Sequence, residues 1–169
     1  MSRTESIGFD EVVRATVAAT QEVFNTMIQI PVTAGRVVET FEPIDADIVS
    51  IVGLAGKRAG YLIFAIDGES ARRVTQAILG LEHSPGAQGL RDTMGEMANI
   101  IGGSLRSIFP EELGSVALGL PLIMSGCIAP VDDPGESGET AMQLNRFGAV
   151  VPFHASDGSH LRFQLIVFV

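Results

Sequence analysis

The stretch DTMGEMANIIGGSLRSIF, residues 92–109, carries the pattern that decides how this chain folds. Its apolar side chains recur at the spacing of an α-helix and share one face: Met94, Met97, Ile101, Leu105 and Ile108. The sequence therefore predicts a long amphipathic helix that ends near Pro110 and packs this face on a core.

The other side of this helix carries a short polar stripe. Because an α-helix turns 100° per residue, Asp92, Glu96 and Asn99 lie within roughly 60° of one another. Glycine is unfavourable inside a helix by roughly 0.5–1 kcal/mol relative to alanine, yet three lie nearby: Gly95, Gly102 and Gly103. This clustering predicts that another backbone or protein surface approaches the helix closely.

The polar stripe has two interpretations, one structural and one functional. In the structural one, Asp92 caps the helix, Glu96 is a solvated helix former and Asn99 is polar without further meaning. In the functional one, Asn99 positions a water molecule, because its amide is both donor and acceptor, and Glu96 offers an anion to a cation on a partner.

The remaining sequence alternates between helical and strand-like patterns. Apolar residues at helical spacing predict a first long helix over residues 9–29, stopped by Pro31. β-Branched, aromatic and glycine-bounded runs predict strands on either side of a short helix: strands within 32–43, 46–56 and 59–67, the helix at 71–80, and strands within 114–126, 139–155 and 159–169. Asp157-Gly158 is typical of a two-residue hairpin turn.

The order of these elements predicts an internal duplication. Residues 9–66 and 89–169 each run from a long helix into strands, with the short helix between them. We expect a single domain of the α/β (α+β) class over residues 1–169, with long helices packed on a mainly antiparallel sheet.

The composition of the chain argues against several classes of partner and site. A net charge of −9 with only 11 Lys and Arg argues against nucleic-acid and anionic-membrane partners. Residues 113–131 have nearly the length of a membrane span, but their Gly and Pro favour a buried strand. The single cysteine excludes an internal disulfide, no Cys/His spacing indicates a metal site, and the N-terminus lacks a secretory pattern, so we expect a cytoplasmic protein.

The spacing Asp92-x3-Glu96-x2-Asn99, followed by Pro121, resembles the signature of the CheC/CheX/FliY family of chemotaxis phosphatases, and its single complete helix is most similar to CheX. The resemblance extends to the duplicated layout over nearly the whole chain. It implies a bacterial protein that hydrolyses the phosphoryl-aspartate of a CheY-type receiver domain.

By this resemblance, Glu96 pairs with a receiver lysine and Asn99 orients the attacking water, while Asp92, Gly103 and Pro121 support the site or contact the partner. No cofactor of its own is implied, because Mg²⁺ belongs to the receiver. The alternative is a CheX-like module that binds a receiver without hydrolysis.

The first predicted helix repeats the Glu-x-x-Asn spacing at Glu22 and Asn25, but Ala18 stands where the family has an acidic residue or Ser. We therefore interpret this pair as a degenerate second site. The resemblance also implies a homodimer formed through the sheets, for which the strand FQLIVFV, residues 163–169, is either an edge or a central strand.

Overall fold

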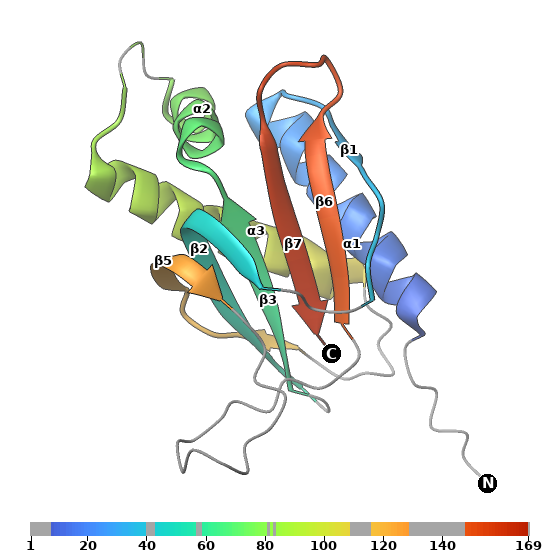
Figure 1. Cartoon of the computed structure of the whole chain (residues 1–169). Coiled ribbons are helices and arrows are strands. Elements are labelled where there is room, and N and C mark those ends of the chain that lie inside the picture. Colours follow the sequence, from blue (N-terminus) through green and yellow to red (C-terminus); the bar gives the residue numbers. More distant parts are fainter. Residues whose placement is uncertain are drawn as a thin grey trace, which may run out of the picture.

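The computed structural model describes residues 8–39, 43–56, 59–80, 82, 84–108, 116–128 and 148–168. The helices lie together on one face of a twisted antiparallel sheet (Figure 1). This arrangement confirms the predicted class of long helices packed on a mainly antiparallel sheet.

The elements follow one another in the order helix, strands, helices, strands. The helices are α1 (Phe9–Val23), continued by the π-helical turn η1 (Phe24–Ile28), then α2 (Gly68–Leu79) and α3 (Ala87–Ile108). The strands are β1 (Val32–Ala34), β2 (Ile44–Ala55), β3 (Gly60–Ile66), β4 (Ala117–Leu118), β5 (Leu122–Ile128), β6 (Gly148–Ala155) and β7 (Arg162–Phe168). The predicted internal duplication stays a prediction.

The sheet has the strand order β1-β6-β7-β3-β2-β4, and every described pair is antiparallel. The long strand β2 pairs on one side with β3 and on the other with both β5 and β4. Since β7 pairs with both β3 and β6, it is a central strand. The option of FQLIVFV as a dimer edge is therefore wrong.

The main core lies between the helices and the sheet. The apolar face of α3 fills its centre, because Met94, Met97, Ile101 and Leu105 are all fully buried, as predicted; the side chain of Ile108 is outside the described residues. Phe163 of β7 stacks on Phe24 and Phe153, with ring centroids 4.7 and 5.1 Å away. Aromatic stacking of this kind adds to the burial of each ring.

A second, smaller apolar cluster lies on the opposite face of the sheet. Side chains alternate between the two faces along a strand, so the residues that do not face the helices gather there. Its buried members are Val49, Ile63, Ala65, Val150, Ile166 and Phe168.

Local signals in the sequence explain how several elements end. Asp67 accepts a hydrogen bond from the Ser70 backbone N–H and so caps α2, while Gly80, at a φ of +62°, ends it. The β6–β7 hairpin is present, but residues 156–161 connect its strands, so the predicted two-residue turn is wrong. Gly158 still takes the positive φ, at +76°.

The segment predicted as a buried strand, residues 113–131, is more exposed in its described part than that prediction expects. Within residues 113–131 the chain forms β4 and β5, with Leu120 and Leu122 exposed, so the prediction of a strand is confirmed and that of burial is wrong. Among the residues that the structure describes, β5 pairs with β2 alone, so it has one neighbouring strand there rather than two. None of the helices in the described part of the chain has the length and apolar character of a membrane span.

Candidate functional site

The polar stripe of α3 faces outward from the core. Asp92 and Glu96 are exposed and Asn99 is partly exposed. The side chains of Glu96 and Asn99 make no hydrogen bond or ion pair with any of the residues that the structure describes. An amide in this position is available to a ligand from outside, whereas an amide bonded inside the core would not be.

Asp92 is not a helix cap. α3 begins at Ala87, so Asp92 lies in its second turn and the capping interpretation is wrong. Its Oδ1 accepts a hydrogen bond of 2.7 Å from the Gln88 side-chain amide, one turn earlier. Asp92 therefore contributes an exposed negative charge beside Glu96 rather than the start of the helix.

Two of the three glycines near the polar stripe of α3 allow close packing inside the molecule. A Cβ placed on Gly95 would lie 2.9 Å from Cδ1 of Ile123 and 3.4 Å from Cγ of Pro121. A Cβ on Gly102 would lie 3.3 Å from Cδ2 of Leu118. The segment from Leu118 to Ile123 thus lies against the helix, and it brings Pro121 next to the residue that precedes Glu96.

Gly103 behaves differently. A Cβ on this residue would meet none of the described residues within 4 Å, so Gly103 is not explained by packing within that part of the molecule. Gly103 follows Asn99 by four residues and therefore lies one turn further along the same face. The predicted close approach of a second surface fits Gly103, while Gly95 and Gly102 are explained by packing within the chain.

The second Glu-x-x-Asn pair has a different setting. Glu22 and Asn25 are both exposed, but Glu22 accepts a hydrogen bond of 3.1 Å from the Ser104 hydroxyl of α3. Asn25 lies in the π-helical turn η1, where the regular α-helical spacing is lost. The pair therefore does not repeat the arrangement of Glu96 and Asn99 on a regular helix.

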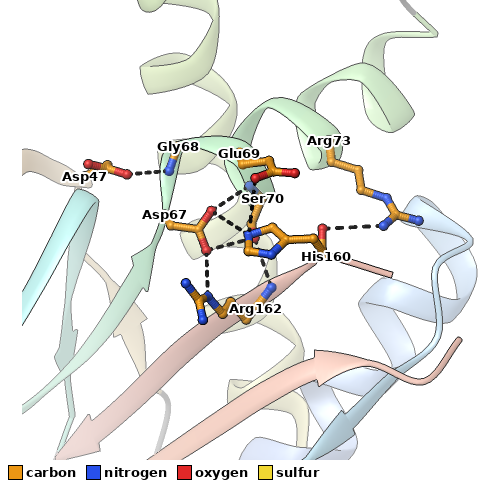
Figure 2. Close-up of polar contacts among 8 residues, drawn as sticks. All are labelled: Asp47, Asp67, Gly68, Glu69, Ser70, Arg73, His160 and Arg162. Carbon is orange, nitrogen blue, oxygen red and sulfur yellow. Dashed lines mark hydrogen bonds and ion pairs between the residues drawn. The ribbon is translucent and has the colours of Figure 1, made fainter. Parts of the chain in front are cut away.

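A separate polar cluster joins the start of α2 to the β6–β7 hairpin (Figure 2). The Asp67 carboxylate contacts His160 Nε2 and Arg162 Nε, each at 3.3 Å. Burial alone would raise the pKa of Asp67, but hydrogen bonds from Ser70 and His160 outweigh it and hold the pKa below its usual value. Sequence reasoning missed this cluster; only the Asp67 cap had a local signal.

This cluster is not a serine hydrolase triad. Ser70 Oγ donates to Asp67 at 3.1 Å and accepts from the Arg162 backbone N–H at 2.9 Å, so the carboxylate contacts both Ser70 and His160. A triad requires the histidine between serine and acid, and the fully buried Ser70 is inaccessible to a substrate. The cluster therefore fastens α2 to the sheet.

One hollow in the structure lies away from α3. This hollow of about 620 Å³ is lined mostly by strand residues, including Asp45, Asp47 and Gln164, and by no residue of α3. It is thus separate from the Asn99 face. Among the residues that the structure describes, no three His, Cys, Asp or Glu side chains are grouped so as to hold a metal ion.

Comparison with solved structures supports the fold. The chain is similar to the chemotaxis protein CheX of Desulfovibrio desulfuricans, with 23% identity, a TM-score of 0.74, and 93% of this chain and 97% of that chain covered. It is also similar to CheX of Borrelia burgdorferi in a complex with CheY, BeF₃ and Mg²⁺, with 20% identity, a TM-score of 0.70, and 96% and 98% covered. FliY of Thermotoga maritima follows at 16% identity and a TM-score of 0.61, with 94% and 87% covered.

No protein of curated function matches the sequence. The sequence model of the family described as chemotaxis phosphatase CheX, however, matches residues 48–145, more than half of the chain and all of α3. The chain therefore belongs to the CheX family of chemotaxis phosphatases.

Proposed function

We propose that this protein hydrolyses the phosphoryl-aspartate of a CheY-type receiver domain, with Asn99 and Glu96 as its catalytic residues. The observation that carries the proposal is the Asn99 side chain: it is partly exposed, has no partner among the described residues, and shares a helix face with Glu96. The CheX of Borrelia burgdorferi was crystallised with CheY, BeF₃ and Mg²⁺, which supports a receiver as the partner.

The chemistry needs few groups from this chain. An acyl phosphate is already activated, and the receiver supplies Mg²⁺ and its own phosphate-binding groups. What remains is to hold a water molecule in line with the leaving carboxylate. The water oxygen attacks phosphorus, the bond to the aspartyl oxygen breaks, and the receiver carboxylate leaves.

Asn99 and Glu96 have different parts in this step. The Asn99 amide is neither acid nor base near pH 7, so it orients the water by hydrogen bonding. The exposed Glu96 carboxylate pairs with a lysine of the receiver and fixes how the two proteins dock. We propose that this chain carries no cofactor of its own. We also propose that the protein is cytoplasmic, because receiver domains are found there.

Decay of the phosphoryl group on receivers of the same organism tests this proposal, with Mg²⁺ present throughout. Asn99→Ala should lower the catalysed rate of dephosphorylation by about 100-fold or more, because a positioned hydrogen-bonding group is lost, while binding to the receiver persists. Asn25→Ala is the matched control, since it removes an exposed Asn of the same spacing from η1, and it should leave the rate unchanged.

The alternative is a module that binds receivers without hydrolysing them. Binding of a receiver by the folded wild-type protein, with no acceleration of decay on any receiver, would establish that alternative. Equal acceleration by the wild type and Asn99→Ala would instead move the catalytic role to another residue.

A further inference from the structure

An exposed leucine lies beside the candidate site. Leu120 is 92% exposed, against 57% for Leu122 and 52% for Leu79, the next most exposed large apolar side chains among the described residues. Single exposed apolar residues are common on protein surfaces and need no explanation by themselves. Whether the exposure of Leu120 indicates a binding role therefore depends on where this residue lies.

That position is set by the packing of the segment 118–121 on α3. Leu118 packs at Gly102 and Pro121 packs at Gly95, so the segment runs along the helix in the opposite direction. The two glycines are two helical turns apart, roughly 10 Å along the axis. Asn99 lies between them on the helix, and Leu120 lies between Leu118 and Pro121 in the segment.

The backbone that carries Leu120 is held on both sides. The Gly119 N–H donates to the Gly53 carbonyl at 2.9 Å, and Leu118 pairs with Leu54 in the sheet. On the other side the Pro121 ring packs at Gly95. Because the backbone is already fixed, covering Leu120 with a partner costs little ordering of the chain.

The other exposed apolar residues nearby belong to the paired part of β5. Leu122 and Met124 pair with Ile51 and Val49, which belong to the apolar cluster on the face of the sheet away from the helices. Ile123, between them, packs on the helix side. Leu120 therefore lies outside the paired residues of β5, in the segment that packs on α3 at Gly102 and Gly95.

We propose that Leu120 is an apolar anchor for the receiver domain whose phosphoryl group reaches Asn99, an inference that rests on the proposed function. A standard protein interface buries about 800 Å² on each partner and involves roughly 20–30 residues. A receiver seated on Asn99 and Glu96 with such a footprint covers Leu120. The receiver then presents an apolar patch to Leu120 beside the lysine that it presents to Glu96.

Steady-state hydrolysis of a phosphorylated receiver by wild type, Leu120→Ala and Leu79→Ala tests the inference. Leu79 is the matched control, because it is an exposed leucine of α2, outside both α3 and the segment 118–121. Loss of most of a buried leucine side chain should raise the KM of Leu120→Ala roughly five- to thirtyfold with kcat little changed. Leu79→Ala should stay within about twofold of wild type, the range expected of a contact outside the interface. Thermal unfolding of both variants checks that the fold is intact.

The outcomes separate this inference from the proposed function. An active wild type with equal KM for Leu120→Ala and Leu79→Ala overturns the anchor and leaves the phosphatase standing. An inactive wild type overturns the phosphatase, and the affinity for a receiver loaded with beryllofluoride then decides on the anchor. Weaker binding by Leu120→Ala alone supports the anchor, whereas equal binding by all three proteins, or none by any of them, overturns it.

Discussion

Replacement of Gly103 by alanine should make the protein more stable and less active. Gly103 lies inside α3, five residues before its end, and a Cβ on it would meet nothing within 4 Å. The new methyl group therefore fits without any movement of the described neighbours. It also projects from the surface one turn beyond Asn99, where the proposed receiver docks.

The expected gain in stability comes from the helix backbone. Alanine is favoured over glycine in a helix interior by about 0.5–1 kcal/mol, because glycine loses more conformational freedom on folding. For a chain of this size, about 1 kcal/mol shifts the melting temperature by roughly 2–4 °C. Gly103→Ala should therefore raise the melting temperature by up to a few degrees.

The expected loss of activity comes from the spacing between the two proteins. A misplacement of about 1 Å at a reacting centre can lower a rate by about 100-fold. A methyl group between α3 and the receiver should lower kcat/KM by about 10- to 100-fold, within that limit. Thermal unfolding and receiver dephosphorylation on the same samples measure both effects.

Gly102→Ala is the matched control. It gains the same backbone preference, but its Cβ would lie 3.3 Å from Cδ2 of Leu118, so this leucine must shift by a few tenths of an ångström, while Leu62 at 3.5 Å is in ordinary contact. Its melting temperature should fall below that of Gly103→Ala. A less stable Gly103→Ala would refute the geometric reasoning, and a stabilised, fully active Gly103→Ala would refute the close approach of a receiver.

Three further substitutions test the fold. Phe163→Ala removes the ring that stacks on Phe24 and Phe153. Urea titrations should show that the free energy of unfolding falls by about 3–5 kcal/mol. A loss below about 1 kcal/mol would contradict the central role of this ring in the core. Ser50→Ala removes a fully buried hydroxyl that has no hydrogen-bond partner among the described residues, so the same titrations should show an unchanged or slightly higher stability. A clear loss of stability would reveal a partner. Asp67→Asn keeps a capping side chain but removes a carboxylate whose pKa is lowered in the folded protein. Its stabilisation by charge is fully present above the unfolded pKa and is lost as the pH falls through the folded pKa. The wild type should therefore be more stable at pH 7, and the difference should shrink as the pH falls below about 4 and vanish below the folded pKa. A difference that is independent of pH would refute the charge as its cause.

Much of the site could be predicted from the sequence because it lies on one helix. The positions of Asp92, Glu96 and Asn99 relative to one another follow from the 100° turn per residue, and the buried face of α3 follows from the spacing of Met94 and its companions. The start of α3 could not be predicted as well, since residues before Asp92 lack a clear capping pattern. Asp92 therefore looked like a cap and lies instead in the second turn.

The part of the site formed by distant residues had no local signal. Three glycines near the polar stripe indicate close approach, but only the tertiary structure assigns Gly95 and Gly102 to packing under the segment 118–123 and leaves Gly103 open. The exposure of Leu120 depends on the same segment. The sequence predicted a buried strand there, because apolar composition does not reveal how many neighbours a strand has.

The sequence by itself determined the helices, the class of fold and the face on which Glu96 and Asn99 lie, because each depends on repeats a few residues long. Only the tertiary structure decided that β7 is central and that Asp67 meets His160 across the chain. It also decided that Glu22 is bonded to Ser104 while Asn99 has no partner among the described residues. These relations depend on which elements pack together, and that choice is made by burial over the whole chain rather than by any short pattern.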